Sequence, residues 1–297
     1  MTKVLILGGS GMLGHKAWQT LAPRFDTFVT FRGAAEAYTA LGIFDQARVV
    51  GGVNACQFET VARAFATVQP QVVVNCIGIV KQEAAAKDPI VNITVNSLFP
   101  HRLAELCDGI GARLIHISTD CVFSGEKGNY SEANAPDATD LYGRTKILGE
   151  VTAGHCLTIR TSMIGRELSS AHGLFEWFWS HAGQRVRGFK RAVFSGFTTG
   201  ALANIIGNVI GNHQTLKGLY HVAAEPINKF ELLSLVNEIY GLRTEIEADE
   251  KFLCDRSLDA TRFRLATGFR PPSWRQMIED MKQDPTPYEL LRNHNQG

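Results

Sequence analysis

The sequence has little of what would place a protein in a membrane, on nucleic acid or outside the cell. No apolar run approaches the roughly 20 residues needed to cross a bilayer. The apolar start "MTKVLILGG" reaches glycines within a few residues, so we expect a strand there rather than a signal peptide. A net charge of +1 gives no overall field to attract nucleic acid or an anionic membrane. We therefore expect a cytoplasmic protein that binds neither membranes nor nucleic acid.

Paired cysteines are also missing. The six cysteines are scattered along the chain, and no two of them have the C-x-x-C spacing. This pattern argues against both a disulfide framework and a zinc site. We expect reduced thiols and no bound metal.

The first half of the chain alternates short apolar runs with helix-like stretches. The runs are rich in β-branched residues and apolar on both faces, which is typical of strands buried in a parallel sheet. This alternation predicts an α/β fold with a doubly wound parallel sheet of the Rossmann type. We expect strands at 3–8, 27–31, 71–78, 112–118 and 156–160, and helices at 12–21, 57–68, 92–108 and 141–152.

The pattern changes after about residue 163. Stretches such as "LFEWFWSHAG" and "NKFELLSLVNEIYG" predict helices, and "GLYHVAA" predicts one more strand. We expect a dinucleotide-binding domain at 1–164 and a smaller, mostly helical substrate-binding lobe at 165–297. Residues 195–225 are expected to return to the first domain.

A glycine-rich turn follows the first expected strand. "LILGGSGMLG" places four glycines between that strand and a helix. Glycine allows a tight turn, a close approach of the backbone to a pyrophosphate, and close packing of the helix on the strand. The free N–H groups of the helix then face the phosphates. We predict that a dinucleotide contacts the whole loop, which consists of Gly8, Gly9, Ser10, Gly11, Met12, Leu13 and Gly14.

The end of the second expected strand bears on the choice of cofactor. It reads "VTFRG" and lacks the carboxylate that would favour a free ribose 2′-hydroxyl. Arg32 could instead pair with a 2′-phosphate through its planar guanidinium. The sequence therefore favours NADP, as NADPH, over NAD. The alternative is a solvated arginine in a site that accepts either cofactor.

Three polar residues point to proton transfer. Tyr142 and Lys146 lie one helical turn apart, and Thr119 follows the strand "RLIHIS" at the sheet edge where ligands bind. Thr119 can hydrogen-bond a substrate oxygen and Tyr142 can give that oxygen a proton. A free tyrosine has a pKa of about 10. We expect the Lys146 ammonium to lower the pKa of Tyr142 and to hydrogen-bond the nicotinamide ribose.

These motifs together resemble those of an extended short-chain dehydrogenase/reductase, in its dTDP-4-dehydrorhamnose reductase-like branch. "GGSGMLG", "VVVNCIG", "HISTDCVFSG", "LYGRTKILGE" and "LTIRTS" stand in the family's order, and "GLYHVA" follows. The resemblance implies an NADP-dependent oxidoreductase that reduces the 4-keto group of a nucleotide-linked 4-keto-6-deoxyhexose, in deoxysugar biosynthesis for surface polysaccharide. It implies that Thr119, Tyr142 and Lys146 are catalytic. We also expect a homodimer.

The resemblance extends to other residues near the cofactor. Asn96 matches a helix asparagine that often supports the lysine through water; the alternative is a helix residue facing solvent. The family often has an aspartate near the adenine, where this chain has "VVGGVNA". The further cofactor contacts implied are Val53, Asn54, Cys76, Ile77, Gly78 and Asn96.

The substrate contacts are less marked in the sequence. Lys81 follows a strand end, and the run "QRVRGFKR" could hold a pyrophosphate, although a solvated basic face is equally consistent. The family often has tyrosine after the motif Ser-Thr-Asp, where this chain has Cys121. The expected contacts are Lys81, Ser118, Asp120, Cys121, His172, Arg187 and Arg191.

Two other functions stay open. GDP-fucose synthases resemble this chain and place a cysteine where Cys121 stands, so Cys121 and His172 could add epimerisation to the reduction. The regulatory subunit of methionine adenosyltransferase also resembles this branch, and it binds NADP without acting as a sugar reductase. A 4,6-dehydratase is not expected, because the glutamate that such enzymes carry after the aspartate is replaced by Cys121.

Overall fold

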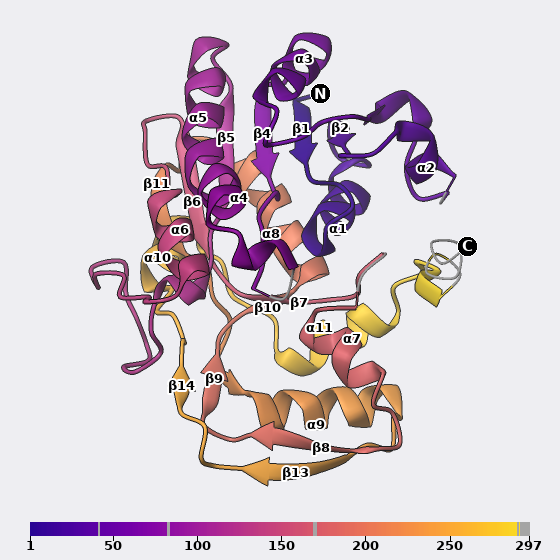
Figure 1. Ribbon diagram of the computed structural model, residues 1–297, viewed down its shortest axis with the longest axis vertical. Coiled ribbons are helices and arrows are strands. Elements are labelled where there is room, and N and C mark those ends of the chain that lie inside the picture. Colours follow the sequence, from indigo (N-terminus) through magenta and orange to yellow (C-terminus); the bar gives the residue numbers. More distant parts are fainter. Residues whose placement is uncertain (41, 82–83, 169–170, 290, 292–297) are drawn as a thin grey trace.

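A parallel sheet forms the centre of the molecule (Figure 1). The computed structural model describes residues 1–40, 42–81, 84–168, 171–289 and 291. Seven strands run in the order β11-β6-β5-β4-β1-β2-β3, and each neighbouring pair is parallel. The predicted doubly wound α/β fold is confirmed, and every strand expected in the first half is present. The strands are β1 (Lys3–Leu7), β2 (Asp26–Thr30), β3 (Val49–Val50), β4 (Val72–Asn75), β5 (Arg113–Ile117), β6 (Cys156–Arg160) and β11 (Gly218–His221).

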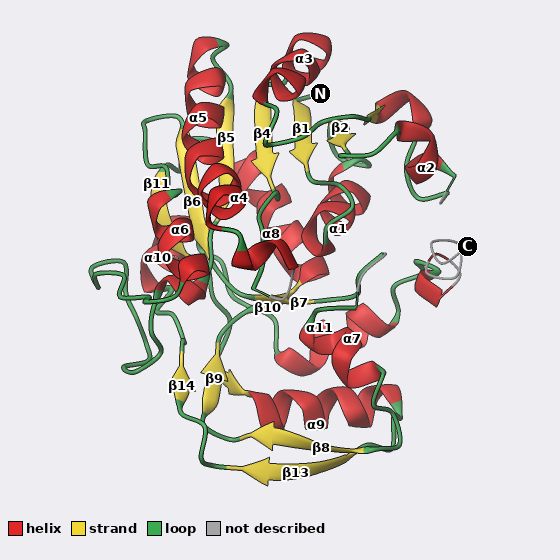
Figure 2. Cartoon of the chain, viewed as in Figure 1, coloured by secondary structure: helices red, strands yellow, loops and turns green. Residues whose placement is uncertain are grey.

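Helices cover both faces of this sheet (Figure 2). Val4 and Ile6 of β1 are buried in one core cluster, and Leu5 and Leu7 are buried in a second. Successive side chains of a strand point to opposite faces, so a strand covered on both sides is apolar at every position. The first cluster includes residues of α1 (Met12–Leu21) and α8 (Thr199–Asn212), and the second includes residues of α3 (Phe58–Val68) and α5 (Phe99–Gly109).

The strand order reverses beside β1. The chain proceeds from β1 to β2 and β3 on one side and then returns to place β4 on the other. Ligands of open α/β sheets bind beyond the carboxyl ends of the strands at such a reversal. The glycine loop follows β1 there, and residues 76–78 follow β4.

The smaller lobe contains more strand than we expected. Besides helices it has two small sheets, β12-β9-β14 and β13-β8, drawn at the foot of Figure 1. These strands are short, or carry charged residues on the exposed side, so periodicity does not reveal them. The elements of this lobe are α7 (Leu174–Trp179), β8 (Arg185–Phe189), β9 (Ala192–Phe194), β12 (Ile227–Asn228), α9 (Lys229–Tyr240), β13 (Glu245–Asp249), β14 (Cys254–Asp255) and α11 (Trp274–Lys282). The short helix α10 (Thr261–Thr267) returns to the central sheet and packs on β11.

The helix expected at 92–108 is interrupted. Its first part, Ile93–Leu98, is a π-helix that separates α4 (Pro89–Asn92) from α5, and Pro100 stands just after it. Proline removes a backbone donor, and π-helical turns are frequent at functional sites. The remaining elements are α2 (Ala35–Thr39), 3₁₀ helices at Gln46–Arg48, Ala84–Lys87 and Asp120–Val122, α4 (Pro89–Asn92), the π-helix Ile93–Leu98, α6 (Leu141–Leu148), β7 (Met163–Ile164) and β10 (Phe197–Thr198).

The cysteines, the helices and the possible metal ligands bear on which functions the chain can have. All six cysteines are free thiols. In the part of the chain that the structure describes, no helix is long and apolar enough to cross a membrane. Within the same ranges, no group of three or more His, Cys, Asp or Glu side chains is arranged to hold a metal ion.

Candidate active site

Several positions of the glycine loop, among them Gly8 and Gly14, can be occupied only by glycine. Gly8 has φ +86°, a conformation that other residues rarely adopt. A Cβ atom on Gly14 would overlap the carbonyl of Gly8, so α1 packs directly on the turn. These requirements arise from the fold itself and bring the first turn of α1 against the end of β1.

The loop fits the pyrophosphate of a dinucleotide. Gly11 is the N-cap of α1 and offers no side chain to cap the helix, so the first-turn N–H groups stay available to an anion. Among the described residues, a Cβ atom on Gly11 would meet only the Gly8 oxygen within 4 Å, at 3.3 Å. Across the reversal, a Cβ atom on Gly8 would lie 3.0 Å from Cγ1 of Ile77. The ends of β1 and β4 therefore converge, as a dinucleotide site requires.

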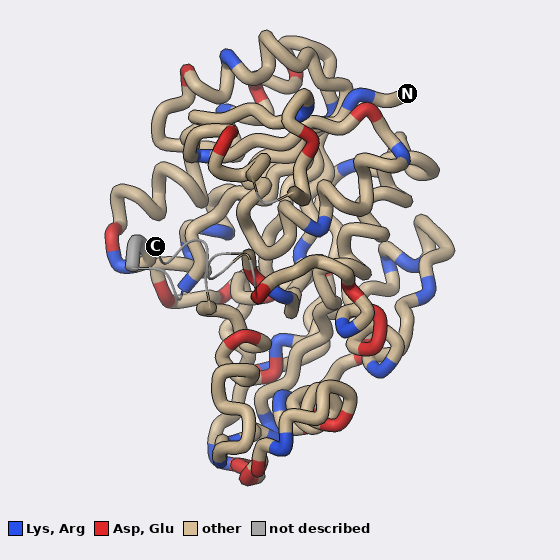
Figure 3. The backbone as a smooth tube through the Cα atoms, turned by 90° about the vertical axis from the view of Figure 1, so that its right-hand side faces the viewer, with Lys and Arg blue, Asp and Glu red and all other residues tan. Residues whose placement is uncertain are grey.

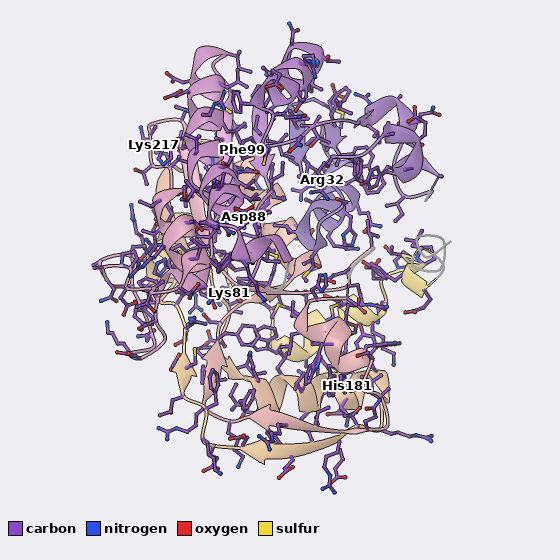
Figure 4. All side chains as sticks on the ribbon, in the orientation of Figure 1. Arg32, Lys81, Asp88, Phe99, His181 and Lys217 are labelled. Atoms are coloured by element: carbon purple, nitrogen blue, oxygen red, sulfur yellow. The ribbon has the colours of Figure 1, made fainter. Side chains whose placement is uncertain are left out.

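The residues after β2 and β3 are those that the sequence predicts at the adenosine end of the expected site. Phe31 is buried and stacks on Tyr38 with ring centroids 3.9 Å apart, which directs the chain so that Arg32 is exposed (Figure 4). Among the described residues, no ion pair engages Arg32. Val53 is buried, and the Asn54 side chain accepts a hydrogen bond from the Cys56 N–H at 3.0 Å. The Arg32 guanidinium is thus available to a phosphate. The Asn54 side chain is already engaged in the turn that it forms with Cys56.

Thr119 and Tyr142 meet at the end of β5. Thr119 is buried; its hydroxyl oxygen accepts from the N–H of Cys121 at 3.1 Å and donates to Asp120 at 3.2 Å. Tyr142 lies in the first turn of α6, where Asp140 caps the helix by accepting from the Gly143 N–H at 3.0 Å. Thr119 also lies close enough to the phenol of Tyr142 to act on its pKa, which it tends to lower. The two hydroxyl groups expected to contact a substrate oxygen therefore lie together.

Lys146 does not act on Tyr142 as we expected. Its Nζ donates to the carbonyl of Ile117 at 2.8 Å, and burial lowers the pKa of Lys146 to about 8. Burial raises the pKa of Tyr142, an effect that Thr119 opposes. The predicted lowering of the Tyr142 pKa is therefore wrong for the chain as the structure shows it, because desolvation of the phenol exceeds any effect of the ammonium.

Lys146 nevertheless faces the expected cofactor site. A Cβ atom on Gly78 would lie 3.9 Å from the Lys146 Nζ and 3.4 Å from the side-chain oxygen of Asn96. Asn96 is buried and clamps the loop after β4, accepting from the Ile79 N–H at 2.9 Å and donating to the Ile79 carbonyl at 3.1 Å. It therefore faces the protein interior rather than solvent. Asn96 itself belongs to the π-helix.

Lys81 lies at the mouth of the site (Figure 4). Its Nζ is 2.8 Å from Asp140 and 5.7 Å from the ring centroid of Tyr142. Asp140 thus holds a cation beside the phenol while capping α6. Sequence reasoning identified Lys81 but missed Asp140, although a carboxylate directly before a helix is a recognisable cap.

A second cation near the site, Arg256, was also missed. It comes from the loop after β14 and donates to the carbonyls of Phe123 at 2.8 Å and Ser124 at 3.2 Å. It faces Asp120, whose pKa is raised by burial, and Cys121, whose pKa is raised to about 12 by burial and by Asp120. No local pattern announces Arg256, because its partners lie about 130 residues earlier.

His172 lies in a turn before α7, and its role in substrate binding stays a prediction. Its N–H donates to Glu167 at 2.8 Å, and a Cβ atom on its neighbour Gly173 would lie 2.7 Å from the methyl group of Met12. The turn that carries His172 therefore packs beside the first turn of α1. Cys121 instead follows β5, beside Thr119 and Tyr142.

Ser118 faces a buried ion pair. Its hydroxyl donates to Glu150 at 2.8 Å, and Glu150 also accepts two bonds of 2.7 Å from Arg160. Arg160 reaches the ring of His221 at 3.2 Å. This cluster ties the ends of α6, β5, β6 and β11 together behind Lys146. Glu150 and His221 were not singled out in the sequence.

The basic run "QRVRGFKR" is matched by acidic residues of a neighbouring strand. β8 and β13 pair in parallel, with Arg185 opposite Glu245 and Arg187 opposite Glu247. Arg187 lies 4.0 Å from Asp249, and Arg191 is exposed just beyond β8. Blue and red segments accordingly lie next to each other at the foot of the tube in Figure 3.

Comparison with known proteins agrees with this architecture. The family model described as "RmlD substrate binding domain" matches residues 1–286. The chain belongs to this family. The resemblance inferred from the motifs is therefore confirmed at the level of the family.

Relatives within and around the RmlD family differ in how much of the chain they share. Over 147 residues the chain is 37% identical to a dTDP-4-dehydrorhamnose reductase of Streptomyces griseus, which covers 49% of this chain and 43% of that protein. It is 25% identical to the spore coat polysaccharide biosynthesis protein SpsK of Bacillus subtilis, and this match covers 96% of this chain and 98% of that protein. Methionine adenosyltransferase 2 subunit beta of Mus musculus is 29% identical over 156 residues, which cover 50% of this chain and 41% of that protein. The chain thus spans less than half the length of the first and third of these proteins.

Solved structures share the fold. A dTDP-4-dehydrorhamnose reductase from Bacillus anthracis, in complex with NADP, matches with a TM-score of 0.78 and 19% identity. The match covers 96% of this chain and 100% of that one. At this identity the similarity establishes the Rossmann-type architecture.

Proposed function

We propose that this RmlD-family protein reduces the 4-keto group of a nucleotide-linked 4-keto-6-deoxyhexose with NADPH, in deoxysugar biosynthesis for surface polysaccharide. One observation carries the proposal. The hydroxyls of Thr119 and Tyr142 and the amine of Lys146 gather at the ends of β4 and β5, beside Gly78 and the glycine loop. The names of the relatives from Streptomyces griseus and Bacillus anthracis support the same reaction.

The residues at this site suit the reducing direction. When bound, NADPH supplies a hydride to the ketone carbon. Thr119 orients the ketone oxygen, and Tyr142 transfers its phenolic proton to that oxygen. The raised pKa of Tyr142 keeps the phenol protonated at neutral pH, and a Lys146 pKa of about 8 lets that amine return a proton to the phenolate.

NADP is favoured over NAD by the exposed cation at the end of β2. Arg32 is available to a 2′-phosphate, and Phe31 holds that part of the chain in place through its stack on Tyr38. A guanidinium fork matches a phosphate with two parallel hydrogen bonds.

An epimerase–reductase is less well supported. A base beside the ketone would need a thiolate, but burial and Asp120 raise the pKa of Cys121 to about 12. The turn that carries His172 packs beside Met12 at Gly173, and among the described residues no contact joins the His172 ring to Cys121.

The regulatory alternative is supported by the similarity to methionine adenosyltransferase 2 subunit beta. Against it stands the presence of all three residues, with Thr119 beside Tyr142 and Lys146 on the next turn of α6. A protein that only binds a partner has no need of a phenol and an amine arranged beside a nucleotide site.

A coupled assay tests the proposal. The protein is mixed with NADPH and with UDP-, dTDP- and GDP-linked 4-keto-6-deoxy sugars, and absorbance at the NADPH band is followed. We expect oxidation with at least one sugar nucleotide. NADPH binding without oxidation of any of them would favour the regulatory alternative, and uptake of deuterium beside the ketone would favour epimerisation.

A homodimer in the cytoplasm completes the proposal. Ile93, Leu98 and Leu148 are half or more exposed on the adjoining π-helix and α6, where a second copy could cover them. Light scattering coupled to size exclusion decides between monomer and dimer. The cytoplasmic assignment is supported by six free thiols and predicts that they stay reduced in the cell.

A further inference from the structure

The segment after α11 returns to the helix that carries the glycine loop. Residues 284–289, which we name the C-terminal strap, run back from α11 in Figure 1. The hydroxyl of Tyr288 lies 2.9 Å from Nε2 of His15, and the two rings meet edge-on with centroids 5.7 Å apart. Both side chains are buried. The strap therefore covers His15, one turn into α1.

Two further hydrogen bonds hold the strap on α1. Lys16 donates to Asp284 at 2.8 Å, and Gln19 donates to Thr286 at 2.8 Å. The hydroxyl of Tyr288 also lies 2.8 Å from Asp284, so its single hydrogen is shared between that carboxylate and Nε2 of His15 as alternative acceptors. The strap thus follows α1 over more than one turn.

His15 connects the strap to the glycine loop. Its Nδ1 lies 2.9 Å from the carbonyl oxygen of Gly11. A carbonyl only accepts, so Nδ1 carries the hydrogen and Nε2 faces Tyr288. Gly11 is the N-cap of α1, and the peptide whose carbonyl is held also carries the N–H of Met12, at the helix terminus that faces the phosphates.

Arg166 anchors the strap from the other side. Its guanidinium lies 4.7 Å from the centroid of the Tyr288 ring and donates to Glu289 at 2.6 Å and to Glu176 of α7 at 2.8 Å. The strap is therefore held between the glycine loop and the smaller lobe, and Tyr288 lies at the junction.

We propose that Tyr288 is a positioning residue for the cofactor: the C-terminal strap fixes the Gly11 peptide through His15 and thereby sets the affinity of the glycine loop for NADPH. The proposal rests on the proposed function only in naming NADPH as the ligand. Neither Tyr288 nor His15 touches the reacting atoms, so we expect an effect on cofactor binding rather than on the chemical step.

Docking of the strap is linked to pH. Burial lowers the pKa of docked His15 from 6.5 to about 4, with Gly11 and Asp284 opposing the shift and Lys16 adding to it. The charged groups on the far side of Tyr288 are Arg166, Glu289 and Glu176. A released strap leaves His15 near its ordinary pKa, so proton uptake between pH 6.5 and 4 favours release. From these two values, the ratio of released to docked strap rises about 30-fold between pH 8 and pH 5.

Tyr288→Phe tests the link, with Tyr240→Phe as its matched control. Tyr288→Phe keeps the ring and removes only the hydroxyl, and we expect the NADPH dissociation constant to rise about 3- to 10-fold, as for one lost hydrogen bond, with kcat unchanged. Tyr240 is a half-buried tyrosine of α9. Its hydroxyl is buried and has no hydrogen-bond partner among the described residues. Tyr240→Phe should leave the dissociation constant unchanged. Equal constants for Tyr288→Phe and wild type would overturn the proposal.

Hydrogen exchange in the cofactor-free protein separates this proposal from the proposed function. Tyr288→Phe should speed exchange of the amides in the first turn of α1, whether or not NADPH binds. If wild-type protein binds no NADPH, the proposed function fails while the exchange rates still decide the role of the strap.

The pH dependence supplies a readout that a merely structural role would not move. Wild type should lose NADPH affinity more steeply than His15→Asn between pH 8 and pH 5, because only wild type has the titrating imidazole. Titration of the cofactor itself is common to both proteins and cancels in the ratio. Parallel pH curves for the two proteins would contradict the linkage.

Discussion

The glycine loop and the β8–β13 edge both carry motifs that suggest phosphate binding, yet they differ in what surrounds them. Around the loop, Gly14 packs on Gly8 only six positions away, and the fold leaves the helix N-terminus open. At the edge, Arg185 lies 2.9 Å from Glu245, sixty positions later. A motif whose geometry depends on residues close in sequence can be interpreted from the sequence alone. The charges of a strand cannot, because the strand that pairs with it decides whether they are neutralised.

We expect the largest effect from a substitution at the catalytic end of the sheet, next to the glycine loop. Tyr142→Phe removes the proton donor and should lower kcat about 100- to 10,000-fold, the usual range for a general acid. Its dissociation constant for NADPH should stay near that of wild type, because the ring remains in place. Full turnover by this variant would show that another group protonates the substrate oxygen.

A smaller effect on stability contrasts a buried ion pair with an exposed one. Glu150→Gln leaves Arg160 buried without its charge partner and should cost about 3–5 kcal/mol of unfolding free energy. Glu245→Gln breaks the exposed pair with Arg185 and should leave the urea midpoint unchanged. Equal urea midpoints for Glu150→Gln and Glu245→Gln would mean that the buried ion pair stabilises the protein no more than the exposed one.

Cofactor selectivity should change by a moderate amount at the end of β2. Arg32→Gln removes a guanidinium available to the 2′-phosphate, and the preference for NADPH over NADH should fall about 10- to 100-fold, as for hydrogen bonds to a charged group. The KM for NADH is the internal control and should not move. An unchanged preference would identify Arg32 as a solvated surface residue.

The smallest effect is expected at the β8–β13 edge. Arg187 faces an acidic strand, so Arg187→Gln should leave both the melting temperature and the KM for the sugar nucleotide unchanged. Arg191→Gln is the companion variant at the end of the same strand. A rise in KM for either would show that the substrate reaches this edge, as the sequence first suggested.

Sequence reasoning recovered the sheet because its strands are apolar on both faces. It placed α1 at 12–21, as the structure has it, because glycines precede the helix and the apolar stripe continues through it. It missed β3 and, in the smaller lobe, β8, β9, β12, β13 and β14, because strands of two or three residues, or strands with charges on one side, carry little periodicity. The division of the chain at residue 164 stays a prediction, as do the roles of the individual site residues.

The sequence by itself determined the family, the glycine turn and the spacing of Tyr142 and Lys146, because each depends on residues within one strand–turn–helix unit. Tertiary structure alone decided that the pKa of Tyr142 rises, that Glu150 is paired with Arg160, and that Tyr288 reaches His15. Local geometry follows from the allowed backbone angles of a few neighbours. Burial and ionic partners depend on segments that are distant in the chain and meet only when the hydrophobic core brings them together.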